Sequence, residues 1–190
     1  MSKIILASSS IYRQELLKRL PIKFTSTSPN INEARINDES FEDQARRLSN
    51  EKAEAIAKKN PSAFVIGSDQ TAEFNNKEVR KPLSIENAFI QLNELSGQTL
   101  NFYSGVCLKN MQKNISTDAV VKFSVTYKKL SKDQIKNYLK IEDPSQCVGS
   151  IKSEGLGITL LEEIRCNDPT AVIGLPLIEL SQMFEKYGVI

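Results

Sequence analysis

The sequence predicts an α/β fold in which helices flank one long mixed sheet. The apolar run from Ile4 to Ala7 is continuous, as in a strand that is buried on both faces. The segment from Ala119 to Leu130 instead alternates apolar and polar residues, as in a strand with one buried face. Amphipathic helical segments lie between the strands without alternating with them regularly. We therefore expect a mixed sheet rather than a series of βαβ units.

The expected helices are defined by caps and by apolar residues at helical spacing. Ser40 and Ser131 begin helices in capping-box patterns, Pro176 suits a first helical residue, and Gly97 and Gly188 suit helix ends. In chain order we expect strands at 3–7, 24–28, 63–66, 99–108, 119–130 and 158–164, helices at 11–20, 40–59, 84–95, 131–140 and 176–187, and polar loops at 29–39 and 109–117.

Length, composition and charge indicate one globular domain. The chain has 190 residues, of which 40% are hydrophobic and 25% charged. Its net charge is +2, and no run of Lys and Arg is long enough to bind nucleic acid or an anionic membrane. No apolar stretch reaches the roughly 20 residues that span a bilayer, and the N-terminus enters a strand rather than a secretory segment. We therefore expect a single domain over residues 1–190, located in the cytoplasm, without nucleic-acid or membrane partners.

Histidine is absent from the sequence, and cysteine is scarce. The absence of histidine excludes Ser–His and Cys–His nucleophile pairs and every His-based zinc site. Cys107, Cys147 and Cys166 are odd in number and far apart, which indicates neither a disulfide framework nor a Cys-x-x-Cys site. Any catalysis must therefore use carboxylates, Lys, Arg, Ser, Tyr, Cys or a metal with oxygen ligands.

The junction between the first strand and the first helix is suited to an anion. Ser8, Ser9 and Ser10 place hydroxyl and backbone N–H groups at the positive end of the helix, which favours a phosphate. Arg13, in the first helical turn, adds a cation that can bind phosphate in a bidentate manner. The alternative is that the serines only cap the helix and that Arg13 is solvated.

Charged residues stand out at four further places along the chain. Lys52 continues the apolar stripe of its helix, so it either needs an anion on the inward face or extends to water from the border of the stripe. Asp69 is expected just beyond the end of the buried strand at 63–66, where open α/β sheets bind ligands, although a cap or turn role is the alternative. Glu33 lies in a polar loop, and Lys81 follows a turn, where a solvated position is the alternative.

These residues together supply the groups that phosphoryl chemistry needs without histidine. Carboxylates such as Glu33 and Asp69 hold a divalent metal and orient water. Cations and a helix N-terminus hold the phosphates, which suits Arg13, Lys52 and Lys81 together with Ser8. We therefore predict a site for phosphoryl chemistry.

Six motifs in order and spacing resemble the Maf family of nucleotide pyrophosphatases, and the resemblance covers essentially the whole chain. The motifs are Leu6-Ala7-Ser8-Ser9-Ser10 with Arg13, Glu51-Lys52-Ala53, Gly67-Ser68-Asp69, Lys81-Pro82, Leu95-Ser96-Gly97 and Gly174-Leu175-Pro176-Leu177. Three further segments resemble the branch of this family that hydrolyses 7-methyl-GTP, namely Gly67-Ser68-Asp69-Gln70, Ser153-Glu154-Gly155 and Asp168-Pro169-Thr170. The branch that hydrolyses dTTP and UTP typically has Asp-Thr at the first of them and Gln-Gly at the second.

The resemblance implies a fold and a set of roles. The implied fold is an elongated mixed sheet flanked by helices, related to inosine triphosphate pyrophosphatase, with the active site in a cleft between two lobes. Asp69 is implied to be the catalytic carboxylate, and Tyr12, Gln70 and Glu154 are implied to tune the choice of base. The resemblance also implies a homodimer.

The chain departs from the family pattern at three positions. Tyr12 stands where this branch often has Trp, Ile11 where Pro is usual, and Arg80 where Gly usually precedes Lys-Pro. The first departure bears on base stacking, and the third bears on how closely that loop approaches a ligand.

The expected function is hydrolysis of 7-methyl-GTP to 7-methyl-GMP and pyrophosphate, with Mg²⁺ or Mn²⁺ as cofactor. Two alternatives stay open at this point. One is a dTTP/UTP pyrophosphatase of the same family, and the other is a nucleotide-binding regulator of septum formation that has no turnover.

Overall fold

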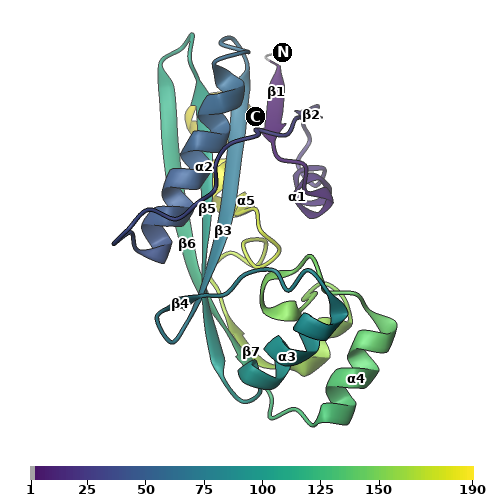
Figure 1. Ribbon diagram of the computed structural model, residues 1–190. Coiled ribbons are helices and arrows are strands. Elements are labelled where there is room, and N and C mark those ends of the chain that lie inside the picture. The colour runs from purple at the N-terminus through teal and green to yellow at the C-terminus, as the bar shows by residue number, and fades with distance from the viewer. Residues whose placement is uncertain (1–2) are drawn as a thin grey trace. The chain divides into compact units, whose positions relative to one another are not determined.

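The computed structural model describes residues 3–190 and confirms an α/β fold with a mixed sheet (Figure 1). The helices are α1 (Ile11–Leu17), α2 (Phe41–Ala57), α3 (Ile85–Leu95), α4 (Lys132–Ile141) and α5 (Leu177–Lys186), with short 3-10 helices η1 (Val148–Ser150) and η2 (Leu156–Leu160). The strands are β1 (Ile4–Ala7), β2 (Thr25–Ser26), β3 (Phe64–Phe74), β4 (Lys77–Glu78), β5 (Thr99–Asn110), β6 (Ile115–Tyr127) and β7 (Leu161–Arg165). They form one sheet in the order β2-β1-β3-β5-β6-β7, with β4 paired to β3.

Tertiary contacts divide the chain into two compact units, and β3, β5 and β6 each have residues in both. The first unit comprises residues 1–70, 103–121 and 168–190, and the second comprises 71–102 and 122–167. The expectation of a single domain stays a prediction.

In the first unit, helices cover both faces of the sheet. β1 pairs in parallel with β2 and with β3, and Ala7 lies opposite Gly67. One face packs on α2 through Ile5, Val65 and Cys107. The other face packs on α1 and α5 through side chains that alternate with these: Ile4, Leu6, Phe64, Ile66, Val106 and Leu108. Burial on both faces explains why the first strand reads as a continuous apolar run.

α2 lies directly on the sheet because glycines of two strands leave room for its backbone (Figure 1). A Cβ atom at Gly67 of β3 would overlap the carbonyl oxygen of Ser49 and would lie 2.7 Å from the backbone nitrogen of Ala53. At Gly105 of β5 a Cβ atom would meet the Ala45 carbonyl group in the same way. A glycine inside a strand often marks such a close approach of two backbones.

Gly67→Ala is expected to destabilise the protein by about 3 kcal/mol, the upper part of the range for overpacking, because the obstructing atoms are helix backbone. For a chain of this size the melting temperature should fall by about 6–12 °C, measured by calorimetry. Gly188→Ala is the control, because its Cβ would meet nothing within 4 Å and only its positive φ would be strained, at about 1–2 kcal/mol. Equal losses for the two variants would contradict the packing argument.

The second unit contains α3 and α4, and the ends of these helices carry the caps that the sequence predicts. Ser131 and Gln134 form the expected capping box at the start of α4, and the C-terminal end of α3 is followed by Gly97 with positive φ. Phe102 and Phe123 stack with ring centroids 4.8 Å apart. In this unit β6 pairs antiparallel with β7, and β3 pairs antiparallel with β4 through a turn at Asn75 and Asn76. The mixed character of the sheet is therefore confirmed.

Several predicted boundaries are wrong. The helix expected at 11–20 ends at Leu17, and the strand expected at 119–130 ends at Tyr127. The strand expected at 63–66 continues to Phe74, so Asp69 lies inside β3 and not beyond its end. The loop expected at 109–117 spans only 111–114, because β5 and β6 are longer than predicted. The segment 158–160 is 3-10 helical, and the strand begins at Leu161.

Within residues 3–190, no helix combines the length and the apolar composition needed to cross a bilayer.

Candidate active site

The candidate site is built around the polar residues of β3. Successive side chains of a strand point to opposite faces. Gly67 and Asp69 accordingly face α2, whereas Ser68 and Gln70 face the loop that precedes α5. The strand can continue through polar residues because the side chains of Ser68, Asp69 and Gln70 each have a hydrogen-bond partner within the first unit.

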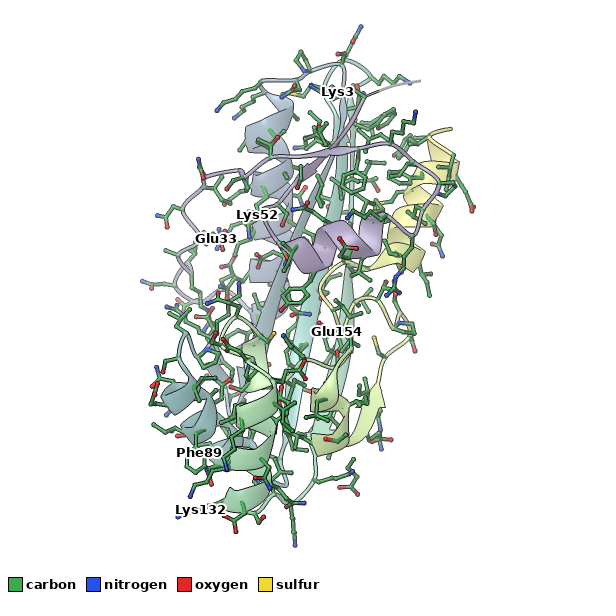
Figure 2. The ribbon with its side chains drawn as sticks, turned by 90° about the vertical axis from the view of Figure 1, so that its right-hand side faces the viewer. Lys3, Glu33, Lys52, Phe89, Lys132 and Glu154 are labelled. Atoms are coloured by element: carbon green, nitrogen blue, oxygen red, sulfur yellow. The ribbon has the colours of Figure 1, made fainter. Side chains whose placement is uncertain are left out.

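On the α2 side, one ammonium group contacts two carboxylates. Lys52 Nζ lies 2.6 Å from Asp69 Oδ1 and 2.9 Å from Glu33 Oε1. Figure 2 shows Glu33 and Lys52 pointing toward one another. The Lys52 and Asp69 side chains are only 7% and 9% exposed, whereas that of Glu33 is 56% exposed. The expectation that Lys52 faces inward and needs an anion is confirmed, and the alternative that it extends to water is wrong.

Burial dominates the electrostatics of Asp69. Removal from water raises the pKa of the Asp69 carboxyl above its usual range, and the positive charges of Lys52 and Arg13 pull it downward. Burial lowers the pKa of Arg13, and the charges of Asp69 and Glu33 oppose that effect. The four residues therefore form one electrostatically linked cluster. A carboxylate with a raised pKa is a stronger base and is better suited to accept a proton from water.

Arg13 is anchored to backbone carbonyls. Its Nε donates to the carbonyl oxygen of Gly174 at 2.8 Å, and its Nη1 donates to that of Ser68 at 2.9 Å. The alternative that Arg13 is simply solvated is therefore wrong. Ser10 caps α1 by accepting from the Arg13 backbone N–H, and the Ser8 hydroxyl accepts from the Ser10 N–H at 3.1 Å. The proposed phosphate contacts of Ser8 and Arg13 stay predictions.

Gln70 belongs to the other face of β3. Its Nε2 donates to Ser104 Oγ at 2.9 Å and to the Ala171 carbonyl oxygen at 3.0 Å. The Gln70 side chain therefore contacts the loop before α5 and not Lys52. Asp168 shapes this loop, because its carboxylate accepts from the backbone N–H groups of Thr170 and Ile178. The role of Gln70 in base choice stays a prediction.

The other predicted site residues are placed as follows. Tyr12 is partly buried on α1, in the first unit. Lys81 and Glu154 are exposed residues of the second unit. Glu154 lies in the loop before η2, where Leu156 N donates to Glu142 Oε2 at 2.6 Å. The roles of Tyr12, Lys81 and Glu154 stay predictions.

Two structural features of the site were missed in the sequence. Arg47 of α2 binds the loop that carries Glu33, and the spacing of Arg47 to Glu51 could have indicated an ion pair on that helix face. The carbonyl groups of Ala171 and Gly174 receive four side-chain donors from the first unit, which no side-chain pattern reveals.

The residues present fit a divalent cation that also binds substrate. Asp69 and Glu33 approach the same point, since both contact Lys52 Nζ. Among residues 3–190 no cluster of three or more acidic, Cys or His side chains could hold a metal. Mg²⁺ commonly uses one or two carboxylates and takes its remaining ligands from phosphates and water, so two carboxylates suffice.

The sequence that carries this fold and site is that of a Maf-like protein. The sequence profile of that family, described as "Maf-like protein", matches residues 3–187, and the chain therefore belongs to the Maf family. A protein of Nitrosococcus oceani named "7-methyl-GTP pyrophosphatase" is 44% identical over 97% of this chain and 93% of its own length. A protein of Hydrogenovibrio crunogenus with the same name is 45% identical over 98% of this chain and 93% of its own length.

One solved structure gives a weaker likeness. It is a nucleoside-triphosphatase, also titled dITP/XTP pyrophosphatase, from Mycobacterium abscessus, and it is 14% identical over 98% of this chain and 97% of its own, with a TM-score of 0.45. At that score the likeness carries no argument, so the expected relation to inosine triphosphate pyrophosphatase is not decided by it.

Proposed function

We propose that this protein hydrolyses 7-methyl-GTP to 7-methyl-GMP and pyrophosphate. The observation that carries the reaction class is the buried Asp69 carboxylate, held 2.6 Å from Lys52 beside a second carboxylate. The substrate is supported by relatives with that name, which are 44% and 45% identical over nearly the whole chain.

The residues of the cluster divide the chemistry. Asp69 orients the attacking water and accepts its proton as the water oxygen bonds to phosphorus and the bond between the α- and β-phosphates breaks. Pyrophosphate leaves with the electron pair of that bond. Lys52 and Arg13, with Lys81 and Ser8, offset the roughly four negative charges of the triphosphate, because phosphoryl transfer depends mainly on positioning and charge stabilisation.

A divalent cation completes the charge balance. We propose that Asp69 and Glu33 would hold Mg²⁺ or Mn²⁺. The bound cation would supply a Lewis acid that neutralises charge on the phosphates. Lys52, which contacts both carboxylates, carries a positive charge that would also offset the charge of the phosphates.

The test of the function is a turnover assay on a panel of triphosphates. Pyrophosphate release from 7-methyl-GTP, GTP, dTTP and UTP is measured with Mg²⁺, with Mn²⁺ and with EDTA. We expect metal-dependent turnover with the highest kcat/KM for 7-methyl-GTP. A higher value for dTTP or UTP would favour the other branch of the family. Stoichiometric nucleotide binding without product would favour a regulatory nucleotide-binding protein.

Glu154→Gln is expected to reduce the preference for 7-methyl-GTP over GTP. Methylation at N7 gives the guanine ring a positive charge, so a carboxylate at Glu154 and an aromatic face at Tyr12 favour it by about 10- to 100-fold. The Gln variant keeps the shape and removes the charge, so the preference should fall while GTP turnover changes little. Glu162→Gln, at another exposed glutamate of the second unit, is the matched control. A Glu154→Gln variant with the full preference would refute the role.

A further inference from the structure

The loop that carries Glu33 needs an anchor other than Glu33 itself. Residues 29–39 have no helix or strand, and ordering a residue costs about 1–2 kcal/mol of backbone entropy. The Glu33 side chain is 56% exposed, and ion pairs at that exposure contribute about 0–1 kcal/mol. The ion pair with Lys52 is therefore too weak to hold the loop, and some other contact must place Glu33.

Arg47 of α2 supplies that contact. Its Nε donates to Glu39 Oε1 at 2.6 Å, and its Nη2 donates to Glu39 Oε2 at 2.8 Å, which is the bidentate geometry that Arg forms best. Nη2 also donates to the carbonyl oxygen of Ala34 at 3.2 Å, next to Glu33 in the chain. The Glu39 and Arg47 side chains are mostly buried, so water competes little with these bonds.

The pair is bound tightly and is itself oriented. The hydrogen bond from Arg47 lowers the pKa of Glu39, and the same bond raises the pKa of Arg47, so both groups stay charged at neutral pH. Glu51, one helical turn further along α2, contacts Arg47 Nη1 at 3.2 Å and fixes the other arm of the guanidinium. Within the loop, Arg35 donates to the carbonyl oxygen of Glu39. This hydrogen bond connects the two ends of the segment that Arg47 binds.

We propose that Arg47 is a positioning residue for the candidate active site, and that it acts by holding Glu33 against Lys52. Arg47 and Lys52 both belong to α2. The helix therefore fixes both the loop and the ammonium group that Glu33 contacts. The inference rests on the proposed function for its kinetic consequence. Its structural part, the anchoring of residues 33–39, stands independently.

The test compares Arg47→Met with Arg46→Met. Arg46 is the adjacent arginine of the same helix, but it pairs with Asp118 and Glu42 and not with the loop. Partners that orient a metal-binding or catalytic side chain typically contribute 10- to 100-fold, so Arg47→Met should lower kcat/KM for 7-methyl-GTP by about that factor. Arg46→Met should change it by no more than about twofold, and Arg47→Lys, which keeps the charge without the fork, should fall between the two.

A double-mutant cycle separates positioning from a general structural role. If Arg47 acts through Glu33, Arg47→Met should cost no more than about twofold in a Glu33→Gln background, because the residue it positions has already lost its charge. A merely structural role would lower activity by the same factor in both backgrounds, and that result would overturn the proposal. Equal losses for Arg46→Met and Arg47→Met would overturn it as well.

Hydrogen exchange gives a readout that does not depend on turnover. In Arg47→Met, amides of residues 33–39 should exchange faster than in the wild type, while those in α2 should not change; Arg46→Met should leave the loop unchanged. Unchanged exchange in the loop of Arg47→Met would overturn the anchoring. Absence of turnover in the wild type would instead refute the proposed function, while the exchange result would still decide the anchoring.

Discussion

Asp69→Asn is expected to lower kcat for triphosphate hydrolysis by about 10²- to 10⁴-fold, the typical contribution of a general base. Asparagine matches aspartate in shape and can still accept a hydrogen bond from Lys52, which lies 2.6 Å from the carboxylate. It cannot accept the proton of the attacking water and is a poorer ligand for a divalent cation. The loss should therefore appear in kcat and not only in KM.

The experiment needs evidence that the variant is folded and that the charge loss is local. Circular dichroism and the melting curve report on the fold. Asp118→Asn is the matched control, because Asp118 is a partly buried carboxylate of the same unit that forms an ion pair with Arg46. It should keep kcat within about twofold. A near-normal kcat in Asp69→Asn would refute the assignment of Asp69 as the base.

Much of the fold can be predicted from local sequence patterns, such as helix caps and apolar stripes. Ser40 and Ser131 cap their helices as predicted, because a cap depends on residues only a few positions apart. The inward position of Lys52 was predictable for the same reason, since it follows from the apolar stripe of a single helix. Its partners were not, because Asp69 and Glu33 reach it from other parts of the chain.

The position of Asp69 shows where the local signals fail. The sequence predicts that the strand ends at residue 66, because Gly67, Ser68 and Asp69 are glycine and small polar residues, which are typical of turns. In the structure the same residues continue β3, since Gly67 admits the backbone of α2 and the polar side chains find buried partners on both faces. These partners come from tertiary packing, which a single sequence does not display.

The contacts of Arg13 and Gln70 were beyond prediction for a related reason. Both side chains donate to backbone carbonyls of the loop before α5, more than 100 positions away in the chain. A carbonyl acceptor exists at every residue, so no residue type marks the partner. The sequence therefore identified which side chains are functional candidates more readily than what they contact.

Lys52→Met is expected to destabilise the protein by about 3–5 kcal/mol near pH 8, because it leaves the buried Asp69 carboxylate without its cation. For a chain of this size the melting temperature should fall by about 6–20 °C. Lys58→Met is the control at the C-terminal cap of the same helix, because Lys58 forms a largely exposed ion pair with Glu54 that contributes only about 0–1 kcal/mol. Methionine matches the length of lysine and favours helix, so the loss of charge dominates the comparison.

The loss of stability should depend on pH with a defined sign. Burial already raises the pKa of Asp69, and removing Lys52 removes a group that lowers it, so the folded-state pKa rises further above the unfolded value. The penalty is then full above the folded-state pKa, and it decreases as the pH falls through that pKa toward the unfolded value, because Asp69 becomes protonated. Urea unfolding at pH 8 and pH 5 in EDTA should therefore show a smaller difference from wild type at pH 5. Adding Asp69→Asn to Lys52→Met should restore most of the stability, since the carboxylate that Lys52 neutralised is then uncharged. A penalty that is independent of pH and survives in the double variant would show that Lys52 stabilises the fold by packing and not by charge.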